Sequence, residues 1–297
     1  MLKLFAGASI AGAAIFAGRY VNTGLACGSP DMASPVAEPG DQVLFRIEQS
    51  GGFVPVEHLF TSLPLVSVYA DGRVITTGPM IEIYPQPALP NLRQTVLTDS
   101  GLQRVLDEVH ATGLFTDTAH YDGPEITDLP DTVFTLTEDG KTVEVSAYAL
   151  GADETTLPER ADPDARSKLL ELQSFMVDLA NHLSTDEIAV ADEPFPIARI
   201  KILAREMDPA NPPRDDPALA QEPVAWPLAT PLAGIASPYE GPLAGSGALC
   251  LAVEGDEAVA LVTAHEGANQ LTPFESAGKQ YQLSVRPLLP DEPTSCE

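Results

Sequence analysis

Positive charge is scarce in this sequence. It has 16 lysine and arginine residues against 43 aspartate and glutamate residues, so its formal net charge at pH 7 is −27. Such a field repels a phosphate backbone, so nucleic acid is excluded as a partner. An anionic membrane is repelled in the same way, so membrane contact is expected only through a lipid anchor. Solubility outside the cell explains the acidity, and attraction of cations or of a basic partner is the alternative.

Long apolar runs are also lacking. Residues 4–18 are small, apolar and uncharged, but they are fewer than the roughly 20 residues that cross a bilayer. Lys3 precedes this run and Arg19 breaks it, a pattern typical of a cleaved signal peptide, which we place at residues 1–26. Residues 27–41 are rich in serine, proline, alanine and acids, so they are predicted to form a flexible tether.

Only three cysteines are present. Cys27 ends the run Gly24-Leu25-Ala26-Cys27, which resembles a bacterial lipoprotein processing box, although that box prefers leucine at the position of Gly24. We therefore keep three interpretations: a lipid anchor on Cys27, ordinary cleavage near Ala26 followed by secretion, and a retained anchor. Each interpretation places the protein outside the cytoplasm, in the cell envelope or the extracellular space.

The other two cysteines, Cys250 and Cys296, bracket the last segment of the chain. An exported protein keeps such a pair oxidised, so we predict one disulfide between them. A free thiol is the alternative. The disulfide would clamp a small C-terminal α+β segment, residues 247–297, with strands near 248–253 and 279–285 and a short helix opened by Asp256.

Residues 42–185 are predicted to form an α+β domain. Asp-Gly pairs at 71–72 and 139–140 lie between β-rich runs and predict two hairpins. Apolar residues at helical spacing follow Thr98, Asp99 and Ser100, any of which offers a helix-capping oxygen, and a second such run follows Asp162, which is predicted to cap its helix. Hairpins pair antiparallel, and two amphipathic helices need an apolar face to cover. We therefore expect an antiparallel sheet with both helices packed on one face.

Residues 186–246 are acidic and rich in proline, which disfavours long helices and central strands. They are predicted to be a linker with one strand, at 197–203. The only tryptophan, Trp226, lies here. It is interpreted either as an anchor for a partner or as a residue that fixes the loop to the body.

Several short motifs recur in order between residues 63 and 183. They are a hairpin at 69–74, a helix ending in 113–115, Tyr121 with the segment 127–132, and Asp139-Gly140-Lys141 before a final helix. In this order they resemble an uncharacterised domain family of secreted and lipoprotein-like bacterial proteins. The resemblance implies an exported α+β domain and no known activity. The long Pro-rich insertion at 79–90 departs from the family pattern.

Catalytic motifs are lacking. His265-Glu266 would need a second histidine where Asn269 stands, and there is no Cys-x-x-Cys or Gly-x-Ser-x-Gly motif. The histidines are scattered: His58, His110, His120, His182 and His265. The sequence therefore predicts no catalytic residue, no metal site and no cofactor. Tyr121 and Asp128 are the one candidate pair for ligand binding, with a local turn as the alternative for Asp128.

The leading hypothesis is therefore an exported, lipid-anchored or secreted binding module that is not an enzyme, and whose partner is an extracellular protein or a small ligand. One alternative is an inhibitor of an extracellular enzyme, since the Pro-rich loops at 85–87 and 212–213 are rigid. Another is a secreted hydrolase, which requires two carboxylates about 5–9.5 Å apart in a cleft. A third alternative is a structural component of the envelope that binds no ligand. The sequence leaves the oligomeric state open.

Overall fold

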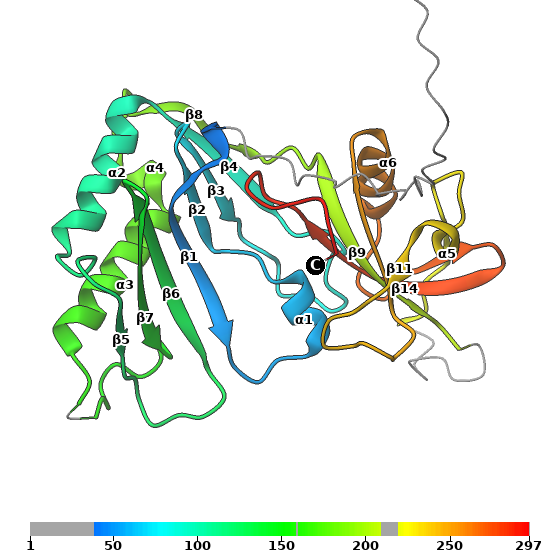
Figure 1. Cartoon of the computed structure of the whole chain (residues 1–297), viewed down its shortest axis with the longest axis horizontal. Helices are drawn as coiled ribbons and strands as arrows, with labels where there is room; N and C mark the ends of the chain where they lie inside the picture. The colour runs from blue at the N-terminus through cyan, green and yellow to red at the C-terminus, as the bar shows by residue number, and fades with distance from the viewer. Residues whose placement is uncertain (1–38, 159, 209–218, 297) are drawn as a thin grey trace, which may run out of the picture. The chain divides into compact units, whose positions relative to one another are not determined.

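The computed structural model describes residues 39–158, 160–208 and 219–296, which form two mainly antiparallel sheets with short helices (Figure 1). The fold is mixed α+β, as predicted. The signal peptide, Cys27 and most of the tether lie outside the described residues. No helix in the described ranges is long and apolar enough to cross a membrane.

The first sheet has eight strands in the order β5-β7-β6-β1-β2-β3-β4-β8. Neighbouring strands are antiparallel except for the short β5, which runs parallel to β7. The strands are β1 (Val43–Gly51), β2 (Val66–Tyr69), β3 (Arg73–Thr77), β4 (Leu92–Leu97), β5 (Ala119–Tyr121), β6 (Pro130–Glu138), β7 (Lys141–Tyr148) and β8 (Ile188–Pro194).

A tight turn joins the two strands of each predicted hairpin, β2–β3 and β6–β7, and the pairing of these strands confirms both hairpins. Asp139 and Gly140 both have positive φ, 51° and 75°, as a two-residue turn between twisted strands requires. Gly72 has φ 87°, and a Cβ atom there would lie 2.7 Å from the Leu97 carbonyl oxygen. Only glycine therefore fits between β2 and β4 at this point.

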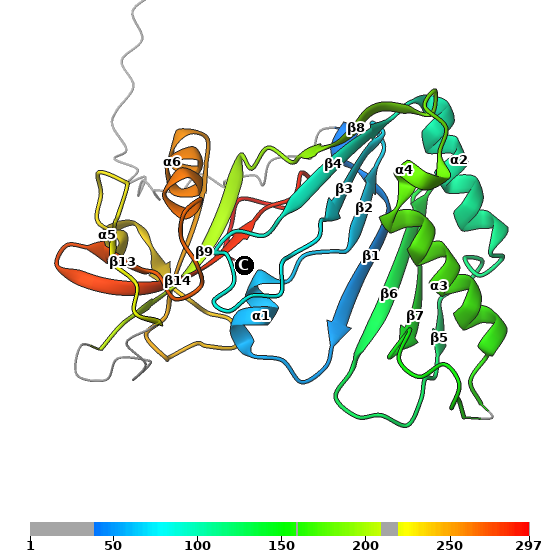
Figure 2. The same ribbon diagram turned by 180° about the vertical axis from the view of Figure 1, so that it is seen from behind.

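Helices α2 (Asp99–Ala111) and α3 (Pro163–Val177) lie on the same face of this sheet, as both views show (Figures 1 and 2). The Thr98 hydroxyl accepts a hydrogen bond from the Gly101 amide at 3.3 Å, and the Asp162 carboxylate accepts one from the Ala165 amide at 3.0 Å. Of the three candidate caps of α2, Thr98 occupies the position, and the predicted cap Asp162 is confirmed. The helices bury their apolar faces with Phe45 and other residues of the central strands in one core. A one-turn helix, α4 (Leu179–His182), follows α3.

The second sheet has six strands in the order β10-β13-β14-β9-β12-β11. These are β9 (Arg199–Glu206), β10 (Val224–Ala225), β11 (Ser237–Pro238), β12 (Leu249–Glu254), β13 (Pro273–Ser276) and β14 (Lys279–Pro287), with helices α5 (Leu232–Ile235) and α6 (Asp256–His265). Asp256 begins α6 but does not cap it; Gly255, with φ 62°, occupies the cap position.

Residues 186–246 contribute more to the sheets than the predicted linker with one strand. They supply the edge strand β8 of the first sheet and the strands β9, β10 and β11 of the second. Strand β9 pairs with both β12 and β14, so it lies inside the sheet and buries Ile200 and Ile202. Trp226 donates to the Thr230 carbonyl oxygen at 2.9 Å and packs against this core.

The predicted disulfide is confirmed: Cys250 in β12 is bonded to Cys296 near the chain end. It ties down the C-terminal strap, which we define as residues 288–296 and which is drawn in red in Figure 1. Arg199 of β9 donates to the carbonyl oxygens of Leu289, Pro290 and Glu292 in this strap, at 2.6–2.9 Å. The strap is therefore fixed to the second sheet at several points.

The same strap reaches the first sheet through Asp291. Its carboxylate accepts hydrogen bonds from Arg46 of β1 at 2.9 and 3.0 Å and from the Tyr69 hydroxyl of β2 at 2.7 Å. Burial opposes the charge of Arg46, but the bond and ion pair with Asp291 more than offset it, so the pKa of Arg46 is raised. Burial and the nearby Asp291 charge raise the pKa of Tyr69 far above its usual value, so Tyr69 stays a neutral donor.

We expect Asp291→Asn to lower the free energy of unfolding by about 2 kcal/mol, because Arg46 and Asp291 are only 19% and 20% exposed and the guanidinium would lose its counter-charge. Urea unfolding of both proteins measures the change. Asp192→Asn is the matched control: Asp192 pairs with Arg93 but is 65% exposed, so its loss should stay within about 0.5 kcal/mol. Equal effects of the two substitutions would contradict the role of the strap.

Candidate functional site

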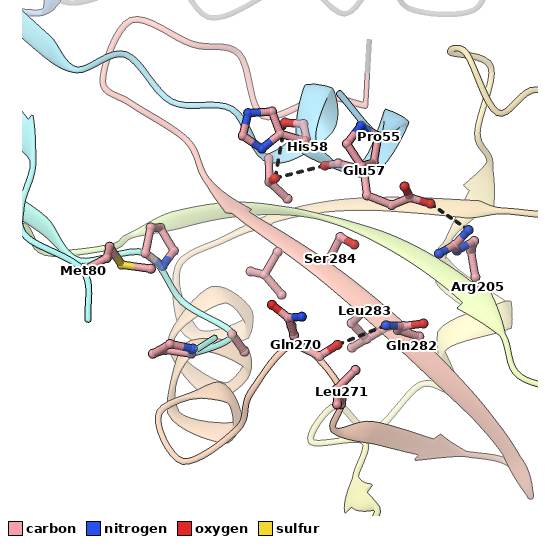
Figure 3. A pocket seen from close by; sticks show the side chains of 15 residues that line it. Pro55, Glu57, His58, Met80, Arg205, Gln270, Leu271, Gln282, Leu283 and Ser284 are labelled. Carbon is pink, nitrogen blue, oxygen red and sulfur yellow. Dashed lines mark hydrogen bonds and ion pairs between the residues drawn. The ribbon is translucent and has the colours of Figure 1, made fainter. Parts of the chain in front are cut away.

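A groove of about 590 Å³ lies between helix α1 (Val56–Thr61), the loop after β3 and strands of the second sheet (Figure 3). One wall is helix α1, the connection between β1 and β2. A second wall is the presenting loop, which we define as residues 78–91, between β3 and β4. The floor comes from β9, β14 and the turn before β13, with Gln270, Leu271, Gln282, Leu283 and Ser284.

Helix α1 is held in place from its buried side. Phe60 is buried against Leu203 of β9 and Cys250 of the disulfide. Its ring packs edge-on against Tyr239 with ring centres 5.8 Å apart, and the Lys201 ammonium lies 5.0 Å from the ring centre. The disulfide and β9 therefore fix the groove wall that carries Glu57 and His58.

The presenting loop is anchored at both ends. At its base the Gly78 amide donates to the Asn91 carbonyl oxygen at 2.7 Å. Near its other end the Ala88 amide donates to the Ala268 carbonyl oxygen at 3.1 Å, and the Gln86 carbonyl oxygen accepts from the Gln270 amide at 2.9 Å. These bonds tie the loop to the turn that precedes β13.

The middle of this loop exposes apolar side chains to solvent. Ile81 is 63% exposed and Ile83 is 51% exposed, while Met80 at their start lines the groove. Leu59 of α1 and Phe53 before it are also exposed. Apart from Met80, none of these residues lines the groove, but each lies within three positions of a residue that does. Single exposed apolar residues are normal on protein surfaces, and several near one hollow mark a candidate interaction site.

Several polar groups of the groove are paired with one another. Glu57 forms an ion pair with Arg205 at 2.7 Å, and the Gln282 amide donates to the Gln270 carbonyl oxygen at 3.0 Å, as Figure 3 shows. Glu57 is the only carboxylate that lines the groove. Hydrolysis by two carboxylates needs two of them, so the groove does not fit the predicted hydrolase. Its chemistry suits recognition of an apolar segment.

A second cavity, of about 380 Å³, lies beside β3, β4 and the end of α3. It contains two carboxylates, but Asp192 is bound by Arg93 and Asp178 by the Asn181 amide. Neither of these two cavities presents a free pair of acids. Within the described ranges, no group of three or more His, Cys, Asp and Glu side chains is placed to hold a metal ion.

The structure brings together a serine, a histidine and an aspartate that lie far apart in the sequence. His120 Nδ1 lies 2.9 Å from the Ser146 hydroxyl and 3.7 Å from Asp131 Oδ1, on strands β5, β7 and β6. A catalytic relay needs the hydroxyl and the carboxylate on opposite ring nitrogens. Here both share Nδ1, so this cluster does not form such a relay.

The two candidate binding residues from the sequence lie near this region but are not joined. Tyr121 of β5 packs on the core of the first sheet, and burial followed by the Asp162 charge raises its pKa. Asp128 is exposed with φ 67°, and its carbonyl oxygen accepts from the Phe53 amide at 3.1 Å. No hydrogen bond or ion pair links the two side chains in the described structure. Their role in ligand binding stays a prediction.

His265, in the nearest approach to a zinc motif, is a core residue. Its Nδ1 lies 2.6 Å from the Leu261 carbonyl oxygen, and its ring stacks on Phe274 with ring centres 4.2 Å apart. Burial lowers the pKa of His265, and the bond to Leu261 only partly opposes this. The folded protein therefore holds this imidazole neutral.

Neutral His265 makes stability depend on pH. As pH falls below about 6.5, the unfolded chain takes up a proton that the folded chain refuses, so the free energy of unfolding drops by up to about 1.4 kcal/mol per pH unit until the lowered pKa is reached. His265→Phe keeps the ring and removes the proton site, so we expect a flatter curve between pH 7.5 and 5. Urea unfolding across this range measures it. His58→Phe, at an exposed histidine, should keep the wild-type slope, and a constant gap between wild type and His265→Phe would contradict the argument.

Sequence reasoning did not find the groove. The one available signal was the run Met80-Ile81-Glu82-Ile83, which places apolar residues inside a Pro-rich loop where no core strand is expected. The floor comes from residues more than 100 positions away, and its approach depends on strand pairing that the sequence does not display. Comparison of the chain with protein-family models, curated proteins and solved structures finds no match.

Proposed function

We propose that this chain is a binding module of the bacterial cell envelope, exported by its N-terminal signal and held by a lipid on Cys27, which takes up an apolar segment of an extracellular protein. The observation that carries this proposal is the anchored loop that exposes Ile81 and Ile83 beside a groove. The disulfide is compatible with an oxidising compartment.

The presenting loop also favours an inhibitor of an extracellular enzyme as a second form of this function. Such inhibitors offer a rigid, exposed loop to the partner, and the bonds at Gly78 and Ala88 restrain this one. The partner's identity separates the two forms, because an inhibitor would lower the activity of the enzyme it binds.

Site-specific photo-crosslinking in the host tests the groove. A photoreactive phenylalanine at position 81 should give one discrete adduct, whose partner is identified by mass spectrometry and rebound as purified protein. Position 259 is the matched control, because Val259 is 56% exposed but belongs to helix α6, none of whose residues lines the groove, whereas Ile81 directly follows the groove-lining Met80. The same adducts from both positions, or none from position 81, would contradict the proposed function.

The lipid anchor is tested separately with Cys27→Ala. Without the thiol there is no site for a diacylglyceryl group, so the protein should move from the membrane fraction to the soluble fraction or the medium. Fractionation followed by immunoblotting measures the shift, with Cys250→Ala as a control that keeps Cys27. A mutant that fractionates like the wild type would show that Cys27 carries no anchor.

A further inference from the structure

The lysine and arginine side chains that the structure describes are all paired with other groups of the chain. Most described arginines, and Lys279, form ion pairs with carboxylates. The others are used as well: Lys141, Lys168 and Arg199 donate to backbone carbonyl oxygens, and Lys201 lies over the Phe60 ring. Every described lysine and arginine therefore has a partner within the chain. A binding partner with acidic groups would find no free cation in the described ranges.

Acidic groups are in excess, and one of them lies in the presenting loop. Glu82 is exposed between Ile81 and Ile83, and it makes no hydrogen bond or ion pair with the described residues. The loop thus offers two apolar side chains with a free carboxylate between them. Net charge of −27 adds a long-range field of the same sign.

We infer that the partner of this groove presents an apolar segment bordered by lysine or arginine side chains. This inference rests on the proposed function and specifies its partner. Apolar contact with Ile81 and Ile83 would supply the buried area, and a cation opposite Glu82 would fix the register and speed association. A second copy of the chain is disfavoured as the occupant, because it would bring two bodies of charge −27 together.

The experiment is a selection of random 12-residue peptides against the chain purified from its host. Peptides that also bind the Ile81→Ser/Ile83→Ser variant are removed, and this variant should fold normally because both side chains are mostly exposed. Thermal unfolding of the variant checks this. We expect the enriched peptides to combine apolar residues with a net positive charge. Their affinity, measured by fluorescence anisotropy, should fall at least tenfold between 50 and 500 mM NaCl.

Charge variants then distinguish the inferred positive charge of the partner from the proposed binding function itself. Glu82→Gln should weaken the enriched peptides about three- to tenfold, and Glu144→Gln, at an exposed glutamate of β7, should not. Groove-dependent peptides that are neutral or acidic would overturn the inferred charge and leave the proposed function standing. Enrichment only of peptides that bind the serine variant equally well, or no enrichment at all, would overturn the proposed function itself.

Discussion

The Arg46–Asp291–Tyr69 cluster is the interaction on which the rest of the structure depends. The first sheet buries β2 on both faces: Val66 and Val68 face the helices, while Ser67 and Tyr69 face the other way. That second face needs a cover, and the C-terminal strap supplies it, with Leu289 packed against Tyr69. The arginine, the carboxylate and the phenol satisfy one another there, which makes burial of three polar groups tolerable. Because the disulfide and Arg199 hold the strap to the second sheet, one short segment links both sheets and so keeps the groove walls in register.

The scarcity of positive charge has a second consequence. Each lysine and arginine of the part of the chain that the structure describes lies against a carboxylate, a carbonyl oxygen or a ring, so many of the more numerous acids keep no cationic partner. Arg166 illustrates the internal use: it is fully buried, pairs with Glu154 at 2.5 Å and donates to the Tyr148 carbonyl oxygen at 2.9 Å. This arginine organises a loop and is unavailable to a ligand. The surface is thus acidic because cations are few and because the described ones are paired within the chain. This acidity bears on the choice of partner.

Local features of the fold followed from the sequence, and long-range ones did not. The Asp139-Gly140 turn, the Thr98 and Asp162 caps and the Cys250–Cys296 bond each depend on residue chemistry that a few neighbours or a redox compartment determine. Strand β9 was expected, but its central place between β12 and β14 depends on pairing partners about 50 and 80 residues further along the chain. Strand β13 has only four residues, which include proline and glutamate, so its strand geometry depends on pairing with β14 and β10. The groove needs all of these pairings at once, so no single segment could indicate it.

The polar and apolar groups of the groove are arranged differently from those of a typical catalytic site. An enzyme places unsatisfied or strained polar groups in a dry pocket, where their pKa values shift and their charges act on a substrate. Here Glu57 forms an ion pair with Arg205, and the Gln282 side-chain amide bonds the Gln270 carbonyl oxygen, so these polar groups are already paired. The side chains left exposed near the groove are apolar. Ile81 and Ile83 expose theirs from a loop that hydrogen bonds hold at both ends. Restraint lowers the conformational entropy lost when such a loop meets a partner, and the exposed apolar area supplies the favourable free energy of association. Both features support the proposed binding function.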